Sequence, residues 1–217
     1  MTELDAPNRP LRADAERNRV KILAAAREVF AERGFAATLD DIADRAGVGV
    51  GTVYRRFPDK DSLIDALFEE RLAGVAELGR QALAADDPWE GFVAFLTEGA
   101  ALQACDRGLK QAMLFRGRDR ASRARATIAP IATELVARAQ AAGSLRADVE
   151  VLDVPIINMM VLSIADLTRD VSPDTYRRML QIVIDGLATS RETPTPLPAR
   201  SICVAELTAA IAERGCP

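Results

Sequence analysis

The chain contains no histidine, so it lacks the commonest general base and the commonest metal ligand of proteins. Its three cysteines, Cys105, Cys203 and Cys216, form no CxxC pair, which argues against a zinc site or a disulfide framework. GxSxG, P-loop and GxGxxG motifs are also missing. We therefore expect reduced thiols, no cofactor, no metal site and no enzymatic activity.

Long apolar segments are also absent. The longest nearly unbroken apolar run, residues 154–165, is too short to span a bilayer. The first nineteen residues have no apolar stretch of the kind found in signal peptides. These two features predict a cytoplasmic protein without a membrane partner.

Acidic residues outnumber basic ones over the whole chain, which has a net charge of −4. Residues 9–60 are the exception, because they hold eleven Arg or Lys against eight Asp or Glu. A mildly basic amino-terminal part on an acidic body is typical of proteins that bind nucleic acid through one region.

The composition favours helices. Alanine, leucine, arginine and glutamate abound, 49% of residues are hydrophobic, and only 5% are aromatic. No alternation typical of strands is present, so we expect an all-α fold. We predict a flexible arm at 1–14, a helix-turn-helix domain at 15–60, a helical effector-binding and dimerisation domain at 61–190, and a Pro-rich linker with a short helix at 191–217.

The amino-terminal part has the signals of a three-helix domain. A helix is predicted at 19–33, with Ile22, Ala26, Val29 and Phe30 on one face. Thr38 and Asp41 predict a capping box that starts a second short helix. Gly47 ends that helix, Pro58 ends the segment 50–57, and Asp59 caps the next helix.

The stretch 46–60, AGVGVGTVYRRFPDK, suits a recognition helix. Ala43, Gly47 and Val53 supply a small crossing residue, a turn with positive φ and an apolar residue facing the core. The first turn of 50–57 has little side-chain bulk, so its backbone can approach a DNA groove. Lys60 occupies the first turn of the next helix, where the helix dipole disfavours a cation, and a phosphate would resolve that mismatch. The alternative is a surface helix with solvated charges.

These motifs resemble the amino-terminal DNA-binding domain of the TetR family of transcriptional regulators. The resemblance covers about residues 17–68, in the pattern T-x-x-x-I-A-x-x-A-G-V followed by G-T-x-Y-x-x-F-x-x-K. VGVGTVYRRFP also resembles the actinobacterial SbtR-like subgroup. The family implies a homodimer, an all-helical ligand domain and, usually, repression relieved by a small molecule.

By position, the resemblance implies DNA contacts along this segment. It places four residues at the DNA backbone (Thr38, Thr52, Tyr54, Lys60) and three near bases (Val50, Gly51, Arg55). Arg56 suits phosphate contact or guanine readout. Gly49 departs from the serine of many relatives; glycine is an acceptable cap, but a hydroxyl that could meet a phosphate is lost.

The rest of the chain predicts helices near 60–84, 88–104, 107–117, 120–142, 152–170 and 173–190, with Pro130 kinking or starting one of them. The segments 154–167 and 176–187 are apolar on a broad face. They predict a twofold dimer interface, unless both are simply internal. The tail helix near Val204, Leu207 and Ile211 docks on its own body or on the partner.

Effector-binding residues are harder to assign, because apolar side chains at helical spacing are usually core. The candidates are Trp89, Phe92, Phe95, Gln111, Phe115 and Asn158. Polar residues inside apolar runs, such as Asn158, Asp166 and Gln111, are equally explained by hydrogen bonds between helices. The basic run 107–125 is either an anion site or, more commonly, a solvated surface.

The sequence thus predicts a homodimeric regulator that binds a palindromic double-stranded operator. It is expected to act as a repressor released by an unidentified small-molecule effector. The alternative is a constitutive helix-turn-helix protein without an effector, whose body would have no cavity of ligand size, roughly 300 Å³.

Overall fold

The computed structural model describes residues 9–104, 117–190, 195–198 and 200–213, and these form helices and no strand. They belong to two compact units, considered separately below. The head unit is Met1–Arg71 with Asp106–Arg120, and the body unit is Leu72–Cys105 with Ala121–Pro217. The expected all-α architecture is confirmed; the predicted helix at 107–117 lies outside the described residues, apart from its last residue.

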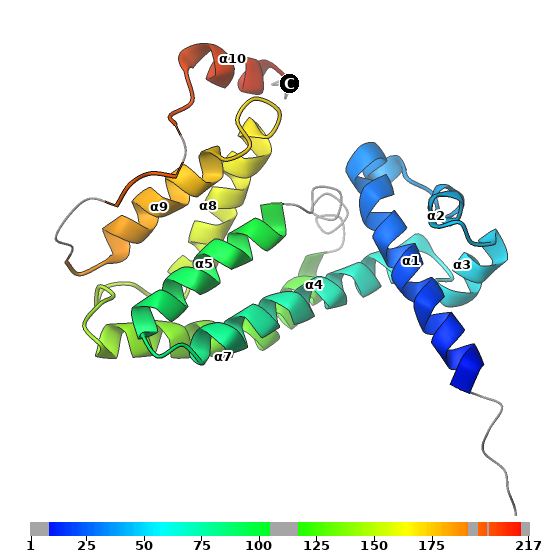
Figure 1. Ribbon diagram of the computed structural model, residues 1–217, viewed down its shortest axis with the longest axis horizontal. Helices are drawn as coiled ribbons and strands as arrows, with labels where there is room; N and C mark the ends of the chain where they lie inside the picture. Colours follow the sequence, from blue (N-terminus) through cyan, green and yellow to red (C-terminus); the bar gives the residue numbers. More distant parts are fainter. Residues whose placement is uncertain (1–8, 105–116, 191–194, 199, 214–217) are drawn as a thin grey trace, which may run out of the picture. The chain divides into compact units, whose positions relative to one another are not determined.

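The head unit is built on α1 (Arg9–Arg33), α2 (Leu39–Ala46), α3 (Val50–Arg56) and the first half of α4 (Lys60–Leu83). In Figure 1, α2 and α3 lie on one side of α1. Their apolar faces close one core, made of Ile22, Leu23, Ala25, Ala26, Val29, Phe30, Ala37, Leu39, Ile42, Ala43, Val53, Phe57, Leu63, Ile64 and Leu67.

Two boundaries of the head differ from the expected ones. Helix α1 begins at Arg9, ten residues before the predicted start and inside the predicted arm 1–14. The predicted domain boundary after residue 60 falls inside the head unit, which runs on to Arg71. The physical reason is that Leu63, Ile64 and Leu67 of α4 complete the head core.

The body unit contains the rest of α4, α5 (Pro88–Ala104), α8 (Asp153–Thr168), α9 (Thr175–Leu187), α10 (Val204–Glu213) and most of α7 (Gly117–Ala141). Pro130 lies inside α7, so it does not start a helix as one alternative held. Helices α5, α8 and α9 pack against one another, and α10 packs on α8 of its own chain (Figure 1).

The core of the body is continuous. It buries Phe92, Phe95 and Leu96 of α5, and Leu135, Val136 and Ala139 of α7. The buried residues of each helix recur every three or four positions, which is why the sequence periodicity located these helices within a few residues.

Candidate nucleic-acid interface

The turn between α2 and α3 has the predicted geometry. Gly47 adopts the left-handed conformation with φ 64° and ends α2. Ala43 and Val53 are both fully buried, so the small residue of α2 and the apolar residue of α3 lie in the head core. The amide of Val48 donates to the carbonyl of Ala43, which closes the turn. The helix-turn-helix prediction is confirmed at each of these positions.

Helix α2 begins with the predicted capping box. The Asp41 amide donates to Thr38 Oγ1 at 3.1 Å, and the Thr38 amide and hydroxyl donate to Asp41 Oδ2 at 2.9 and 2.7 Å. These bonds, with the Arg33 guanidinium, hold the pKa of Asp41 below its usual value. The Thr38 hydroxyl proton is therefore already engaged, so a phosphate at this position must compete with Asp41.

Helix α3 has one buried side and an accessible remainder. Val53 and the following Phe57 anchor it in the core, while Val50 is 40% exposed and Tyr54 is 46% exposed. Thr52 is half-buried, and Arg55 and Arg56 are exposed. The helix therefore presents small groups at its start and a phenol with two cations at its end.

The glycines at the start of α3 are not required by the packing of the head. A methyl group added at Gly51 would meet no atom within 4 Å, and one at Gly49 would meet only Thr52 Oγ1 at 3.8 Å. Gly49 has ordinary extended geometry and supplies no side-chain cap. Because the fold does not need these glycines, their effect is to keep the outer surface of α3 low.

The two arginines of α3 are held loosely. Arg55 Nη2 lies 3.4 Å from Thr52 Oγ1, and the Arg56 guanidinium lies over the Phe57 ring, 5.6 Å from its centroid. Neither contact uses all the donors of a guanidinium, which has five N–H groups. Both side chains therefore keep donors for bases or phosphates.

Lys60 is not the unsatisfied cation that its place in the sequence predicts. Its ammonium donates to the Ala37 carbonyl at 2.9 Å and lies 6.0 Å from the centroid of the Phe30 ring. Partial burial lowers the pKa of Lys60, against the opposing effect of Asp61. The cation at the start of α4 is thus satisfied by the head itself, and a phosphate is not needed to explain it.

Asp59 caps α4 as expected. Its Oδ1 accepts from the Ser62 amide at 2.7 Å. The loop between α3 and α4 is therefore fixed at both ends, by Phe57 in the core and by this cap.

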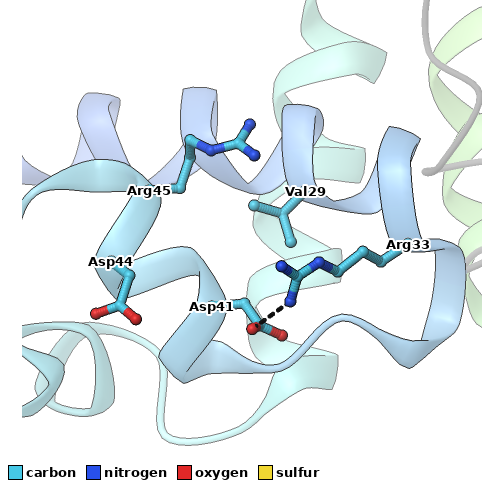
Figure 2. Close-up of a pocket in the computed structure, with 5 residues that line it drawn as sticks. All are labelled: Val29, Arg33, Asp41, Asp44 and Arg45. Atoms are coloured by element: carbon cyan, nitrogen blue, oxygen red, sulfur yellow. Dashed lines mark hydrogen bonds and ion pairs between the residues drawn. The ribbon is translucent and has the colours of Figure 1, made fainter.

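A polar cleft of about 360 Å³ lies between α1 and α2, lined by Val29, Arg33, Asp41, Asp44 and Arg45. Figure 2 shows Arg33 reaching Asp41 across the cleft. Arg45 pairs with Glu28 at 3.0 Å and Glu32 at 2.7 Å. Sequence reasoning missed this network, although Glu28 and Glu32 share a face of α1 at i, i+4 spacing. The carboxylates of this network repel phosphate. The cleft is therefore not a phosphate-binding addition to the exposed surface of α3.

The effector candidates in the body belong mostly to its core. Phe92 and Phe95 are buried, and the partly buried Trp89 stacks on Phe92 with ring centroids 6.0 Å apart. Asn158 is half-buried on α8. Gln111 and Phe115 lie outside the described residues. Asp166 accepts from Arg169 at 3.2 Å, so this polar residue has a structural partner.

A cavity of about 160 Å³ lies between α5 and α9, near Pro198. None of the predicted effector residues lines it. Its lining is Thr97, Ala101, Tyr176, Arg177, Leu180, Gln181, Ile184 and Pro198. Its volume is about half the roughly 300 Å³ typical of a ligand pocket.

The face expected to form a dimer is exposed and apolar in the single chain. On α8 and the residue before it, Ile156, Met159, Met160 and Leu152 are exposed, with Met159 at 68%. On α9, Ile182 is exposed, whereas Leu180 and Ile184 are buried in the body core. Both helices therefore face the core on one side and leave apolar side chains uncovered on the other.

The described part of the chain offers neither a metal site nor a membrane span. No cluster of three or more metal-ligating side chains occurs among the described residues. None of their helices is long and apolar enough to cross a membrane.

Family models match both parts of the chain. The model described as bacterial regulatory proteins of the tetR family matches residues 22–67. A model described as the C-terminal domain of SbtR-like transcriptional regulators matches residues 87–189.

Solved structures of other proteins are similar to this chain over most of its length. A TetR transcription regulatory protein from Mycobacterium vanbaalenii is 36% identical, covering 83% of this chain and 100% of that one, with a TM-score of 0.63. A TetR transcriptional regulator from Streptomyces coelicolor is 32% identical, covering 79% and 99%, with a TM-score of 0.62.

Matches to curated relatives are shorter. The transcriptional activator FasR of Mycolicibacterium smegmatis is 40% identical over 73 residues, which are 33% of each chain. The transcriptional repressor KstR2 of Rhodococcus jostii is 44% identical over 50 residues, 23% of this chain and 24% of that one. The chain thus aligns with about a third or less of these relatives' length.

Proposed function

The chain belongs to the TetR family of bacterial transcriptional regulators, and from this premise we propose that it is a homodimeric repressor released from a palindromic operator by a small molecule. Family membership makes it a DNA-binding transcription regulator rather than an enzyme. The observation that supports the proposed binding mode best is α3, which is anchored by the fully buried Val53 and leaves Val50, Gly51 and residues 54–56 exposed. Its place of action is the cytoplasm, where the operator lies.

The contacts of α3 follow from what its residues present. Val50 and Gly51 approach the bases, where an apolar side chain can meet thymine methyl groups. Arg55 donates hydrogen bonds to the edge of a guanine, and Arg56 contacts a phosphate or a second guanine. Gly49 lets the backbone come close to the groove.

The proposed backbone contacts surround these base contacts. The hydroxyl groups of Thr52 and Tyr54 donate hydrogen bonds to phosphate oxygens. Lys60 and Thr38 are proposed to contact phosphates in competition with their bonds inside the head, to the Ala37 carbonyl and to Asp41. Phosphate contacts fix the register of the protein on the duplex without reading its sequence.

The proposed dimer is a twofold pairing through α8 and α9. The support is the exposed apolar set Leu152, Ile156, Met159, Met160 and Ile182. Several large apolar side chains left exposed on two helices that pack against each other favour an interface. Twofold symmetry then matches a palindromic site, with half-sites about 34–36 Å apart in successive major grooves.

The effector is proposed to bind in the body and to favour a state that binds the operator less well. Trp89, Phe92, Phe95 and Asn158 remain candidate contacts, with Gln111 and Phe115. The cavity of about 160 Å³ is small for a ligand and favours the second candidate function, a constitutive DNA-binding protein. Repression is likewise a proposal, since the relatives include a named activator and a named repressor.

The test is selection of bound fragments from a random duplex pool, with the oligomeric state measured by light scattering. A dimer that enriches a gapped palindrome supports the proposal. Tyr54→Ala is the loss-of-binding variant. Because Tyr54 is exposed, its replacement leaves the head core intact, and it should weaken enrichment of the palindrome. A monomer, or a pool without any enriched palindrome at low salt, would overturn the proposal.

Effector release is tested separately. Mixed metabolite extracts are added to the protein on the selected duplex, and fluorescence anisotropy reports dissociation. Fractions that release the duplex support a regulated repressor. Binding that no fraction changes would favour the constitutive alternative.

A further inference from the structure

The cavity of about 160 Å³ lies between α5 and α9, two helices of the body that pack against each other (Figure 1). Leu180 and Ile184 of α9 line it four residues apart, and both are buried in the body core. Thr97 and Ala101 line it from α5, and their side chains are too small to fill the space. The cavity therefore follows from the sequence, because small residues of one helix meet larger residues of the other.

The volume of this cavity is that of a single six-membered ring. An engineered protein cavity of about 150 Å³ with an apolar lining binds benzene. Side chains that line an unfilled space lack packing partners on that side, and a bound ring supplies them. The cavity is therefore too small for a drug-sized effector but sufficient for one ring.

A cation lies on the solvent side of the cavity. Arg177 of α9 lines it, and the Arg177 side chain is about half-exposed. Its Nε contacts Asp174 Oδ1 at 3.2 Å, and its guanidinium lies 5.6 Å from the centroid of the Tyr176 ring. These contacts hold the guanidinium without using all its donors, because it has five N–H groups. A guanidinium binds a carboxylate through two parallel hydrogen bonds, so this position favours an acid over a neutral ring.

The tail of the chain supplies another wall of the cavity. Pro198, in the Pro-rich segment that follows α9, lines it. The ring of a proline fixes its φ angle, so this wall loses little freedom when a ligand binds against it. The match to the SbtR-like C-terminal model ends at residue 189, before this segment. The complete cavity is therefore a feature of this chain, which the match to the family model does not supply.

We propose that this cavity is the effector site and that the effector is a single-ring carboxylic acid, bound as its anion. This inference rests on the proposed function, and it places the effector beside α9 instead of among the aromatic residues of the core. The ring packs on Leu180 and Ile184, and the carboxylate accepts hydrogen bonds from Arg177. Ile182, on the exposed side of α9, belongs to the proposed dimer face, so ligand and partner subunit contact opposite sides of one helix. A ligand that binds two states of the protein unequally shifts it between them.

The first test compares three probes on the purified full-length protein by isothermal titration calorimetry. Benzoate has one ring and one charge, benzamide is its neutral analogue of similar shape, and 2-naphthoate carries the same charge on two rings. We expect benzoate to bind about tenfold more tightly than benzamide, because charge-assisted hydrogen bonds are the stronger ones. 2-Naphthoate should bind at least about tenfold more weakly than benzoate, because its second ring exceeds the volume of the cavity.

Variants locate the binding. Arg177→Met should weaken benzoate binding about tenfold and leave benzamide binding unchanged, and the exposure of Arg177 makes this change compatible with folding. Arg178→Met removes the same charge from the next position of α9, which does not line the cavity, and should bind benzoate as the wild type does. Ala101→Leu fills the cavity and should weaken the binding of both probes. If Ala101→Leu does not fold, the ratio of benzoate to benzamide affinity in Arg177→Met still decides the question.

Fluorescence anisotropy on the selected duplex tests whether the ligand is an effector. Saturating benzoate should lower the operator affinity of the wild type at least about tenfold, and Arg177→Met should need about tenfold more benzoate for the same effect. No benzoate binding up to about 10 mM, equal benzoate affinity of Arg177→Met and wild type, or bound benzoate without any effect on operator affinity would overturn this inference alone. Failure of the ligand-free protein to select a palindrome would instead contradict the proposed function.

Discussion

At the scale of single residues, the head separates structural from exposed groups along one short helix. Val53 and Phe57 are buried, whereas Tyr54, Arg55 and Arg56 between them are exposed. Neighbours in sequence therefore have different expected effects when replaced. We expect changes at 53 or 57 to alter folding, and changes at 54–56 to alter the proposed DNA binding with the fold intact.

Arg55 and Lys60 should differ in what they contribute to binding. Arg55→Ala is expected to cost about 1–3 kcal/mol on the selected operator and to relax the preference at one base pair. Lys60→Met should weaken binding to all duplexes alike and lower the salt slope by about one, since one fewer counterion is released. Affinities by fluorescence anisotropy at several salt concentrations check both. Equal loss of specificity in the two variants would contradict the assignment of Arg55 to a base and of Lys60 to a phosphate.

At the scale of elements, the start of α2 depends on an ionised carboxylate. The Thr38 and Arg33 donors stabilise the charged form of Asp41, so its folded-state pKa lies below the unfolded value near 3.8. A depressed carboxyl pKa contributes stability that is present above the unfolded pKa and is lost as pH falls through the folded one.

We therefore expect the difference in melting temperature between wild type and Asp41→Asn to shrink as the pH falls from about 5 to about 3. The group is exposed, so high salt should reduce the pH-dependent part. Asp40→Asn, in the same turn but outside the capping box, is the matched control. A difference that stays constant down to pH 3 would argue against an ionised capping box.

The contact between α4 and α7 gives a second prediction for an element. Gly79→Ala places a methyl group 2.4 Å from Ile131 Cγ2 and should destabilise the body by about 1–3 kcal/mol. Gly74→Ala, on the same helix, meets only Leu102 Cδ2 at 3.5 Å. It should be neutral or stabilise by up to about 1 kcal/mol through helix propensity. Urea unfolding of both variants checks this, and equal stabilities would contradict the close approach.

At the scale of the whole molecule, the proposed dimer face carries the apolar side chains of α8 and α9. Ile156→Asp puts a charge into both halves of a twofold interface and should raise the dimer dissociation constant at least about a hundredfold. Operator affinity should fall with it. Light scattering over a concentration series measures the effect.

Val204→Asp is the control for this variant. Val204 is more exposed than Ile156, but it lies on α10, outside the proposed face. It should leave the dimer intact. Dissociation by Val204→Asp together with a stable Ile156→Asp dimer would place the interface on α10 instead.

The sequence by itself determined the elements with strong local signals. Periodicity, caps and turn glycines act within a few residues of the chain. The helix-turn-helix and its boundaries could therefore be predicted from the caps Thr38 and Asp59, the turn residue Gly47 and the apolar Val53. The body helices followed from the same periodicity. The start of α1 at Arg9 was not predicted, because its first turns have no apolar face to show where the helix begins.

Only the tertiary structure decided which distant groups meet. Arg120 with Asp65, Arg45 with Glu28 and Glu32, and Lys60 with the Ala37 carbonyl are pairs separated by 13 to 55 residues. A charged side chain has the same local pattern whether it is solvated or paired, so no sequence signal distinguishes the two. Packing the helices together sets which charges lie close enough to pair, and it also sets which of them, such as Arg120, lose water and therefore need a partner.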